Sequence, residues 1–239
     1  MRVLMQFDVT AIPISYRLGI LSVIKEMVKQ GSEDFYRNFF EDNRKRIKPF
    51  AYAAYIPNMK IKDDLLLGDA LIVTISSPSY ELMMHLLNGS QNKKVFKYKS
   101  NEWVLSNKRL LPHPPKMTSV MTFKTLSPIL IEDSNNRPIL AGDDLFEKEF
   151  NYYADLKANE LFDRSLYQPI KIIQTAMKKQ VVKEHFHQEQ DKPLFFTANS
   201  GRIKLEGHPE DLKIIYDVGI GKRTSLGFGL LDIEEVTYV

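Results

Sequence analysis

Three prolines within four positions divide this chain of 239 residues into two halves. They are Pro112, Pro114 and Pro115, in the segment LPHPPKM. Proline lacks a backbone donor and holds φ fixed, so a cluster of prolines fits neither the interior of a helix nor a central strand. The sequence therefore predicts an N-terminal domain at 1–111, a linker at 112–118 and a C-terminal domain at 119–239.

The first half alternates between the apolar patterns of strands and helices. β-Branched runs predict strands, and apolar residues at helical spacing, as from Leu18 to Val28, predict helices. Gly31 and Gly89 are expected to end helices, and Ser32 to cap the start of one. The expected elements are a strand at 1–10, helices at 12–31 and 32–43, strands at 50–57 and 67–77, a helix at 78–89, and one or two strands at 93–111. This order, βαββαβ, is typical of a ferredoxin-like unit.

The second half repeats this order without an evident sequence repeat. The expected elements are a strand at 119–131, a helix at 143–162, strands or a hairpin at 168–187, a strand at 192–207, a helix at 208–219 and a closing strand at 226–239. The predicted fold class is α+β, with two tandem ferredoxin-like (RRM-like) domains and a C-terminal glycine-rich loop.

Composition excludes several classes of protein. The chain has no cysteine, which rules out disulfides and thiolate metal sites. No apolar run approaches the roughly 18 residues of a membrane helix, and the opening MRVLMQFDVT is too short and too polar for a signal peptide. The sequence therefore predicts a cytoplasmic protein with no membrane partner.

Positive charge is concentrated in the first half. Residues 1–118 carry 18 Lys and Arg against 11 Asp and Glu, whereas residues 119–239 carry 15 against 19. An uneven basic surface suits a polyanion, because neutralising phosphates releases their counterions. On charge alone, a solvated lysine-rich surface is the simpler interpretation.

The segment GIGKRTSLGFG at 219–229 is a glycine-rich loop between a predicted helix and the last strand. Glycine permits positive φ and lets several N–H groups point at one anion, and the intervening side chains add cations and hydroxyl donors. The segment fits neither a dinucleotide-binding loop, which opens a helix, nor a Walker loop. A plain turn between helix and strand is the alternative. The residues suited to hold a phosphodiester backbone are Gly219, Gly221, Lys222, Arg223, Thr224, Ser225, Gly227 and Gly229.

A loop of the form GxGxxxxxGFG before the last strand of a second ferredoxin-like half resembles the signature of the RAMP superfamily. Within it, the chain resembles the sixth CRISPR-associated protein family, the metal-independent endoribonucleases that cut CRISPR repeat RNA. The segment TFKTLSPILI at 122–131 resembles the first strand of that family's second domain. The helix IPISYRLGILSVIKEM and the later strand KPFAYAAYI resemble its N-terminal half. The resemblance covers essentially the whole chain.

The resemblance implies cleavage without metal or cofactor. The ribose 2′-hydroxyl attacks the adjacent phosphate and leaves a 2′,3′-cyclic phosphate, which requires a base, an acid and a cation. The family's usual histidine position reads Asp42 here, and Lys48 matches the accompanying lysine. The family's tyrosine in the first helix has no clear counterpart, since Leu21 falls near that place and Tyr16 lies a turn or more away. The catalytic candidates are Lys48, Asp42, Lys45 and Tyr16.

Two basic clusters are further candidates for RNA contact. RKRIK at 44–48 is the densest and contributes Arg44 and Arg46, and the predicted hairpin contributes Lys178 and Lys179. His185 and His187 alternate in that hairpin, where they suit RNA contact better than metal binding because no third ligand is evident. We expect no metal site.

Three functions fit these observations. The first is an endoribonuclease that cuts precursor CRISPR RNA, and the second is a non-catalytic homologue that binds repeat RNA without the histidine. A structural RAMP subunit of an effector complex is the third, against which the two-domain layout and the TLSP segment argue. The expected partner is CRISPR repeat RNA, with other CRISPR effector subunits and a homodimer left open.

Overall fold

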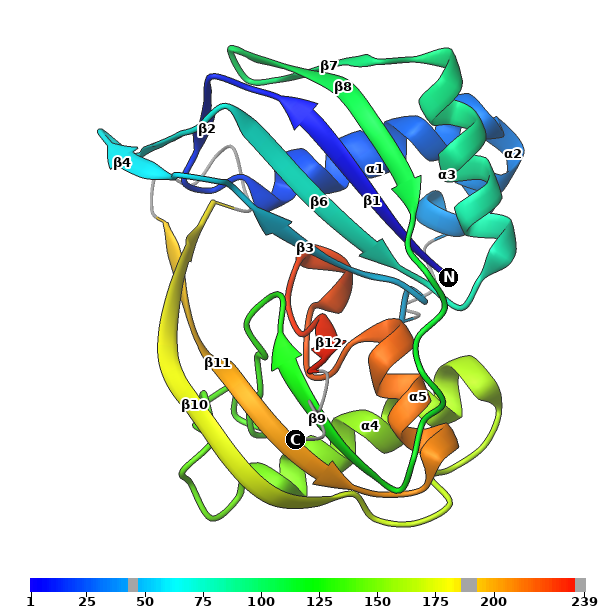
Figure 1. Cartoon of the computed structure of the whole chain (residues 1–239), viewed down its shortest axis with the longest axis vertical. Helices are drawn as coiled ribbons and strands as arrows, with labels where there is room; N and C mark the ends of the chain where they lie inside the picture. Colours follow the sequence, from blue (N-terminus) through cyan, green and yellow to red (C-terminus); the bar gives the residue numbers. More distant parts are fainter. Residues whose placement is uncertain (43–46, 186–192, 235–239) are drawn as a thin grey trace. The chain divides into compact units, whose positions relative to one another are not determined.

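The computed structural model describes residues 1–42, 47–185 and 193–234, and the chain folds as two compact units. The first unit comprises Met1–Arg46, Ala54–Leu111 and Lys183–Leu194. The second comprises Ile47–Ala53, Pro112–Val182 and Phe195–Val239. Each unit combines helices with antiparallel strands (Figure 1).

The first unit has the βαββαβ order that the sequence predicts. Its elements are β1 (Arg2–Asp8), α1 (Arg17–Gly31), β3 (Ala51–Tyr55), β6 (Ala70–Ser76), α3 (Tyr80–Asn92) and β8 (Asn101–Leu110), with β7 (Val95–Tyr98) added as a hairpin partner of β8. The first three residues of β3 belong to the second unit. The sheet order is β3-β6-β1-β8-β7, so β1 is central. Met5 of β1 lies opposite Val73 of β6 and Lys108 of β8 in antiparallel register.

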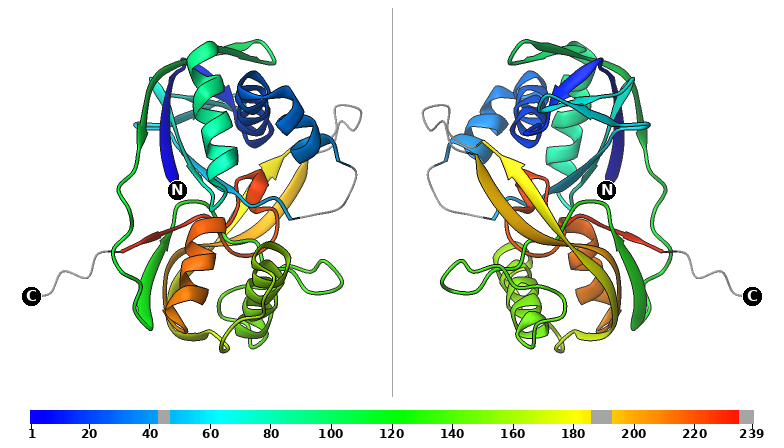
Figure 2. Two further views of the ribbon diagram at one scale, coloured as in Figure 1. Left: turned by 90° about the vertical axis from the view of Figure 1, so that its right-hand side faces the viewer. Right: turned by 90° about the vertical axis from the view of Figure 1, so that its left-hand side faces the viewer.

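Alternating side chains of β1 form part of the core of the first unit. Val3, Met5 and Phe7 point to one face of the sheet and are buried, as period-two side-chain geometry requires. The apolar stripe of α1, including Ile20 and Met27, is buried as well. Figure 2 shows α1 and α3 side by side on one face of this sheet. Burial of these two apolar surfaces against each other stabilises the unit.

Gly89 does not end its helix, contrary to the prediction. α3 continues to Asn92, and a Cβ at Gly89 would collide with the carbonyl oxygen of Met27 in α1. Gly31, the last residue of α1, meets the carbonyl oxygen of His85 in the same way. The two glycines therefore let the backbones of α1 and α3 approach closely.

The segments between these elements add structure that the sequence patterns only partly indicated. Ser32 caps α2 (Glu33–Tyr36) by accepting a hydrogen bond from the amide of Phe35 at 3.2 Å, as predicted. A π-helical turn, η1 (Arg37–Glu41), follows. A small sheet of order β2-β5-β4 was not expected. It is built from β2 (Ala11–Pro13), β5 (Leu65–Leu67) and β4 (Lys60–Lys62).

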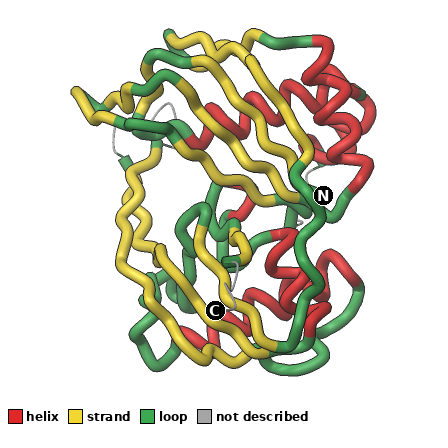
Figure 3. The backbone as a smooth tube through the Cα atoms, viewed as in Figure 1, coloured by secondary structure: helices red, strands yellow, loops and turns green. Residues whose placement is uncertain are grey.

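The second unit repeats the same order with different proportions. Its elements are β9 (Val120–Thr125), α4 (Phe146–Phe162), β10 (Lys171–Glu184), β11 (Leu194–Glu206), α5 (Pro209–Val218), η2 (Thr224–Leu226) and β12 (Leu231–Ile233). The sheet order is β10-β11-β9-β12. Figure 3 shows β10 and β11 as one long hairpin. The last two residues of β10 belong to the first unit.

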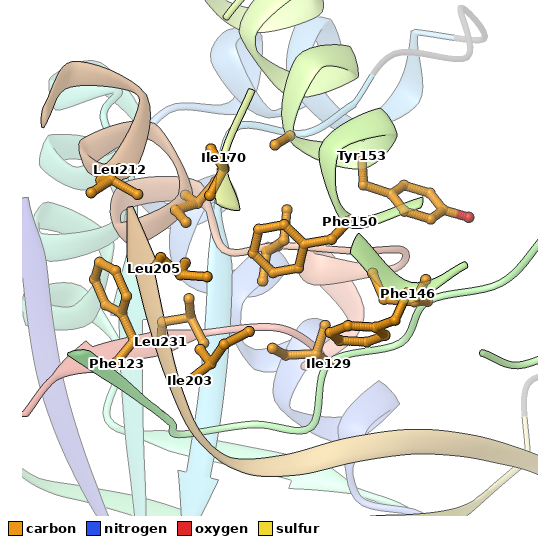
Figure 4. Close-up of a cluster of buried hydrophobic side chains, with 14 of the residues drawn as sticks. Phe123, Ile129, Phe146, Phe150, Tyr153, Ile170, Ile203, Leu205, Leu212 and Leu231 are labelled. Carbon is orange, nitrogen blue, oxygen red and sulfur yellow. The ribbon is translucent and has the colours of Figure 1, made fainter. Parts of the chain in front are cut away.

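One apolar cluster forms the core of the second unit (Figure 4). Phe123 of β9 and Ile203 of β11 are paired in register, and both side chains are buried. Phe146, Phe150 and Tyr153 of α4 pack on the same cluster, whereas Leu145, just before the helix, is exposed. Both units thus place the second, third, first and fourth strands of the repeat side by side, which makes the chain two tandem ferredoxin-like folds.

Candidate functional site

The glycine-rich loop leaves α5 at Gly219 and turns back before β12. Its four glycines all have positive φ, between 68° and 83°. A Cβ at Gly221 would collide with the carbonyl oxygen of Leu130, and one at Gly229 would collide with that of Ile220. Backbone therefore packs directly on backbone here, so the glycines are required by the fold of the loop itself.

Six amide groups in and beside the loop donate hydrogen bonds within the second unit. They belong to Ile220, Lys222, Leu226, Gly227, Gly229 and Leu230, with donor–acceptor distances of 2.8–3.2 Å. Among the described residues, the amides of Gly221, Thr224 and Ser225 have no protein acceptor. The sequence predicted that amides throughout the loop could bind an anion, and the structure leaves these three without a protein acceptor.

The cations of the loop have different surroundings. The ammonium of Lys222 donates to Glu132 Oε2 and Asn136 Oδ1, each at 2.6 Å. Arg223 is exposed, and its guanidinium lies 5.2 Å from the centre of the Phe196 ring. Arg223 is therefore the exposed cation of the loop, whereas Lys222 is held by Glu132.

Thr224 rests on a buried lysine that the sequence analysis did not select. Lys157 of α4 is 2% exposed, and its ammonium donates to Thr224 Oγ1 at 3.1 Å and to the carbonyl oxygen of Val218 at 3.4 Å. Burial lowers the pKa of Lys157 from 10.5 to about 7. The sequence signal was a lysine on the apolar face of α4, beside Ala154 and Ala158.

The other predicted basic residues fall in two groups. Lys178 and Lys179 are exposed on β10, as a role in RNA contact requires. Arg44, Lys45 and Arg46 lie outside the described residues.

The predicted catalytic residues of the N-terminal half occupy separate elements. Tyr16 is the half-buried residue that precedes α1, with the Arg17 guanidinium 5.0 Å from its ring centre. Asp42 follows η1 in the first unit, whereas Lys48 belongs to the second unit. Both side chains are half-buried, and the carbonyl of Lys48 accepts a hydrogen bond from the amide of Phe50 at 2.8 Å.

A cavity of about 1020 Å³ lies in the first unit. Its walls come from the residues before α1, the first half of α1, the β4–β5 turn, the β7–β8 turn and the residue after β10. The lining side chains that carry charge or titrate are Lys25, Asp63, Asp64, Lys97, Tyr98, Lys99 and His185. Leu21, near the place of the family's tyrosine, also lines it. Tyr98 and its lysine neighbours come from the segment KYK at 97–99.

A buried ion pair fixes the strand end that carries His185. Glu184 is fully buried and accepts from Arg17 Nη1 at 2.9 Å. Burial raises the pKa of Glu184 above its ordinary value, although the Arg17 cation acts in the opposite direction. His185 follows Glu184 directly, and its side chain lines the cavity.

Another ion pair holds the β4–β5 turn, which forms a further wall of the cavity. Lys183 donates to both carboxylate oxygens of Asp64 at 2.9 Å, which neutralises one of the two acidic side chains in the lining. Burial raises the pKa of Tyr98, so its hydroxyl keeps its proton at neutral pH. The cavity therefore combines three lysines, a histidine and a protonated phenol.

No group of three or more His, Cys, Asp or Glu side chains in the described part of the chain is arranged to hold a metal ion. No helix among these residues is both long and apolar enough to cross a membrane.

Comparison with known proteins gives one family and one fold. The family model described as "CRISPR associated protein Cas6, C-terminal" matches residues 111–233. No curated protein matches the sequence.

Solved structures resemble the chain over nearly its whole length. A protein described under "Characterization of a Cas6-related gene from Pyrococcus furiosus" has a TM-score of 0.79 at 19% identity, covering 98% of each chain. One described as "An RAMP protein binding different RNA substrates" has a TM-score of 0.78 at 17% identity, covering 98% of this chain and 100% of that one. A third, "CRISPR associated protein Cas6", has a TM-score of 0.74 at 19% identity, covering 98% and 99%. At such identities, the likeness shows the fold alone.

Proposed function

Because the chain belongs to the Cas6 family of CRISPR-associated proteins, we propose that it binds CRISPR repeat RNA and cleaves precursor CRISPR RNA within the repeat. Cleavage proceeds without metal, by attack of a ribose 2′-hydroxyl on the adjacent phosphate. The bond from phosphorus to the 5′-oxygen breaks, and a 2′,3′-cyclic phosphate remains. The proposal places the activity in the cytoplasm, with the repeat RNA as the partner.

The observation that carries the proposal is the cavity of the first unit. Lys25, Lys97 and Lys99 supply cations for phosphate, and Tyr98 supplies an aromatic face for a base. The volume of about 1020 Å³ is large enough for more than one nucleotide. A basic cavity that carries an aromatic side chain suits single-stranded RNA better than a duplex.

His185 gives the cavity a proton carrier that Asp42 does not supply well. A carboxylate repels the phosphate it would have to approach, whereas an imidazole can accept or donate a proton and carries no negative charge. In the proposed reaction, His185 accepts the 2′-hydroxyl proton, Lys97 and Lys99 stabilise the charged phosphorane, and a protonated side chain such as Tyr98 donates to the leaving 5′-oxygen.

The second unit supplies separate proposed RNA contacts, from its C-terminal loop and from β10. Arg223 and the amides of Thr224 and Ser225 hold a phosphate, and Lys178 and Lys179 follow the backbone along β10. Lys48, with Arg44, Lys45 and Arg46 before it, adds positive charge along the chain toward β3. These residues position the RNA and act as cations rather than as proton carriers.

The test uses the purified chain, labelled repeat RNA and excess EDTA. The expected result is a product with a 2′,3′-cyclic phosphate end. His185→Ala should reduce cleavage at least about 100-fold while changing the RNA affinity little, since a general base contributes about 100-fold or more. Lys48→Ala should lower the rate less. Unchanged cleavage by His185→Ala would remove that residue from the reaction.

Asp42 favours a second candidate function, a homologue that binds repeat RNA without cutting it. That function predicts binding with no product at any protein concentration, and His185→Ala would then have no rate to change. Sedimentation of the protein with and without RNA separates a monomer from a homodimer in either case. Assembly with other CRISPR effector subunits would appear as co-sedimentation with them.

A further inference from the structure

The cavity of the first unit has walls of opposite charge. Lys25 of α1 and Lys99 of the β7–β8 turn line it. The β4–β5 turn contributes two carboxylates, Asp63 and Asp64. Asp64 is neutralised by Lys183, which donates to both of its carboxylate oxygens, whereas Asp63 forms no ion pair with any residue that the structure describes. A cavity that attracts phosphate through its lysines thus also holds one carboxylate whose oxygens are available to a donor.

The turn that carries Asp63 is held in place by its neighbours. Asp63 and Asp64 are its two residues, because Lys62 pairs with Leu65 across the hairpin, and they have positive φ of 49° and 62°. Besides its ion pair, Asp64 anchors the turn through its carbonyl oxygen, which accepts from the amide of Ile14 at 2.8 Å. A side chain on a tight and anchored turn is presented in a nearly fixed position, as a group that selects a ligand must be.

Apolar side chains line the same cavity. Leu18 and Leu21 of α1 and Leu65 of β5 are incompletely buried there, and the ring of Tyr98 also contributes. Proteins that read single-stranded RNA hold unstacked bases against such side chains and identify each base by hydrogen bonds to its edge. The cavity therefore has the surfaces that a nucleobase needs, in addition to the cations that a phosphate needs.

A carboxylate discriminates among the bases of RNA, because both of its oxygens only accept hydrogen bonds. Guanine presents two adjacent donors on its Watson–Crick edge, N1–H and the N2 amino group, and can satisfy both oxygens at once. Adenine and cytosine each present one amino group beside a ring nitrogen that accepts, and uracil presents one N–H between two carbonyl oxygens. Those acceptors repel a carboxylate, so guanine is the base that Asp63 fits.

We propose that Asp63 is a specificity-determining residue, which selects a guanine in the bound RNA by accepting hydrogen bonds from N1–H and from the N2 amino group. This inference rests on the proposed RNA binding. The charges of the cavity favour the same orientation, because Asp63 repels the phosphates, whereas Lys25 and Lys99 attract them. The base edge then faces the β4–β5 turn, and the backbone phosphates face the lysines.

The experiment compares the affinities of short oligouridines of one length that carry a single central guanosine, inosine, adenosine or cytidine. Excess EDTA is present, and deoxyribose at the central nucleotide and at both of its neighbours prevents attack by a 2′-hydroxyl there. Because the phosphates are the same in every oligonucleotide, differences in affinity report the central base. The wild type should bind the guanosine oligonucleotide about tenfold or more tighter than the adenosine, cytidine and all-uridine ones. Inosine, which lacks the N2 amino group, should give an intermediate affinity.

Asp63→Asn tests the carboxylate while keeping the turn, since asparagine also tolerates positive φ. One end of its carboxamide donates, so it cannot accept from both guanine donors, and the preference for guanosine should be lost. Asp69→Asn removes the same charge from an exposed position of the same unit outside the cavity lining, and it should keep the preference.

The outcomes separate this inference from the proposed function. Equal wild-type affinities for all the oligonucleotides, or a guanosine preference that survives in Asp63→Asn, would overturn the role of Asp63 alone. Binding of repeat RNA without measurable binding of the guanosine oligonucleotide would do the same. If neither repeat RNA nor any oligonucleotide binds, the proposed function is wrong, and this inference with it.

Discussion

Arg17, at the start of α1, and Glu184, at the end of β10, are 167 positions apart in the sequence and form a buried ion pair at 2.9 Å. Both side chains are almost completely buried. The pair joins the helix that lines one side of the cavity to the strand end that presents His185 on another. The position of His185 therefore depends on a contact made by its neighbour.

Replacing Arg17 with Met should destabilise the protein by about 3–5 kcal/mol, because Glu184 is left buried without its cation. The double variant Arg17→Met, Glu184→Met should recover most of that free energy of unfolding, since it buries no charge. Urea unfolding of both variants measures the difference. If the double variant is no more stable than the single one, the pair stabilises the protein through the packing of its side chains and not through its charges.

The loss in Arg17→Met should depend on pH. Burial raises the folded-state pKa of Glu184, and removing Arg17 raises it further, because that cation lowers it. A carboxyl group with a raised folded-state pKa favours folding at low pH and opposes it as pH rises through that pKa. The variant should therefore lose less stability at about pH 4 than at about pH 8, and equal losses would contradict this reasoning.

The close approach of α1 and α3 predicts the effect of a single added methyl group. A Cβ at Gly89 collides with the carbonyl of Met27, so Gly89→Ala should cost about 1–3 kcal/mol or more in the free energy of unfolding, by pushing the helices apart. Gly142→Ala is the matched control, because no heavy atom lies within 4 Å of the added Cβ. Similar thermal stability of the two variants would show that the helices separate at little cost.

Gly89 also shows what a local sequence pattern does not predict. Local sequence patterns indicate the alternation of Val3, Met5 and Phe7, the cap at Ser32 and the order of elements in both units. Each of these features depends on residues that are close together in the chain. A glycine near the end of an apolar helical run looks like a stop signal. Its actual role depends on Met27, a residue on a different helix.

The candidate site also has parts that the sequence shows and parts that only the fold brings together. The glycine-rich loop is visible in the sequence, but the amides of Lys222 and Gly229 donate to the carbonyls of Leu130 and Pro128, which no spacing rule relates to this loop. Lys157 could not be selected because its partner Thr224 is 67 positions away. The cavity likewise gathers segments around Lys25, Asp64, Lys99 and His185 that only the fold brings together.

The lysines of the cavity should contribute to RNA affinity in a salt-dependent way. Lys97→Ala and Lys99→Ala should each weaken repeat-RNA binding and lower the slope of log affinity against log salt by about one. Lys60→Ala, an exposed lysine of the same unit outside the cavity, should change neither quantity. If Lys60→Ala weakens binding as much as the cavity variants, general positive charge and not the cavity attracts the RNA.

Lys157 makes a prediction about stability that needs no RNA. Its folded-state pKa of about 7 lies below its ordinary value of 10.5, so the unfolded chain binds the extra proton between these limits. Stability from this residue is fully present above the higher value and is lost as pH falls toward the lower one. Lys157→Met removes the penalty together with two hydrogen bonds. The penalty is about 5 kcal/mol near pH 6 and about 1 kcal/mol near pH 10, whereas the two hydrogen bonds contribute about 3 kcal/mol at both. Lys157→Met should therefore raise the free energy of unfolding by about 2 kcal/mol near pH 6 and lower it by about 2 kcal/mol near pH 10. Thermal unfolding of wild type and variant across this range measures the difference, and a variant that is equally destabilised at both ends would mean that Lys157 carries no proton-linked cost.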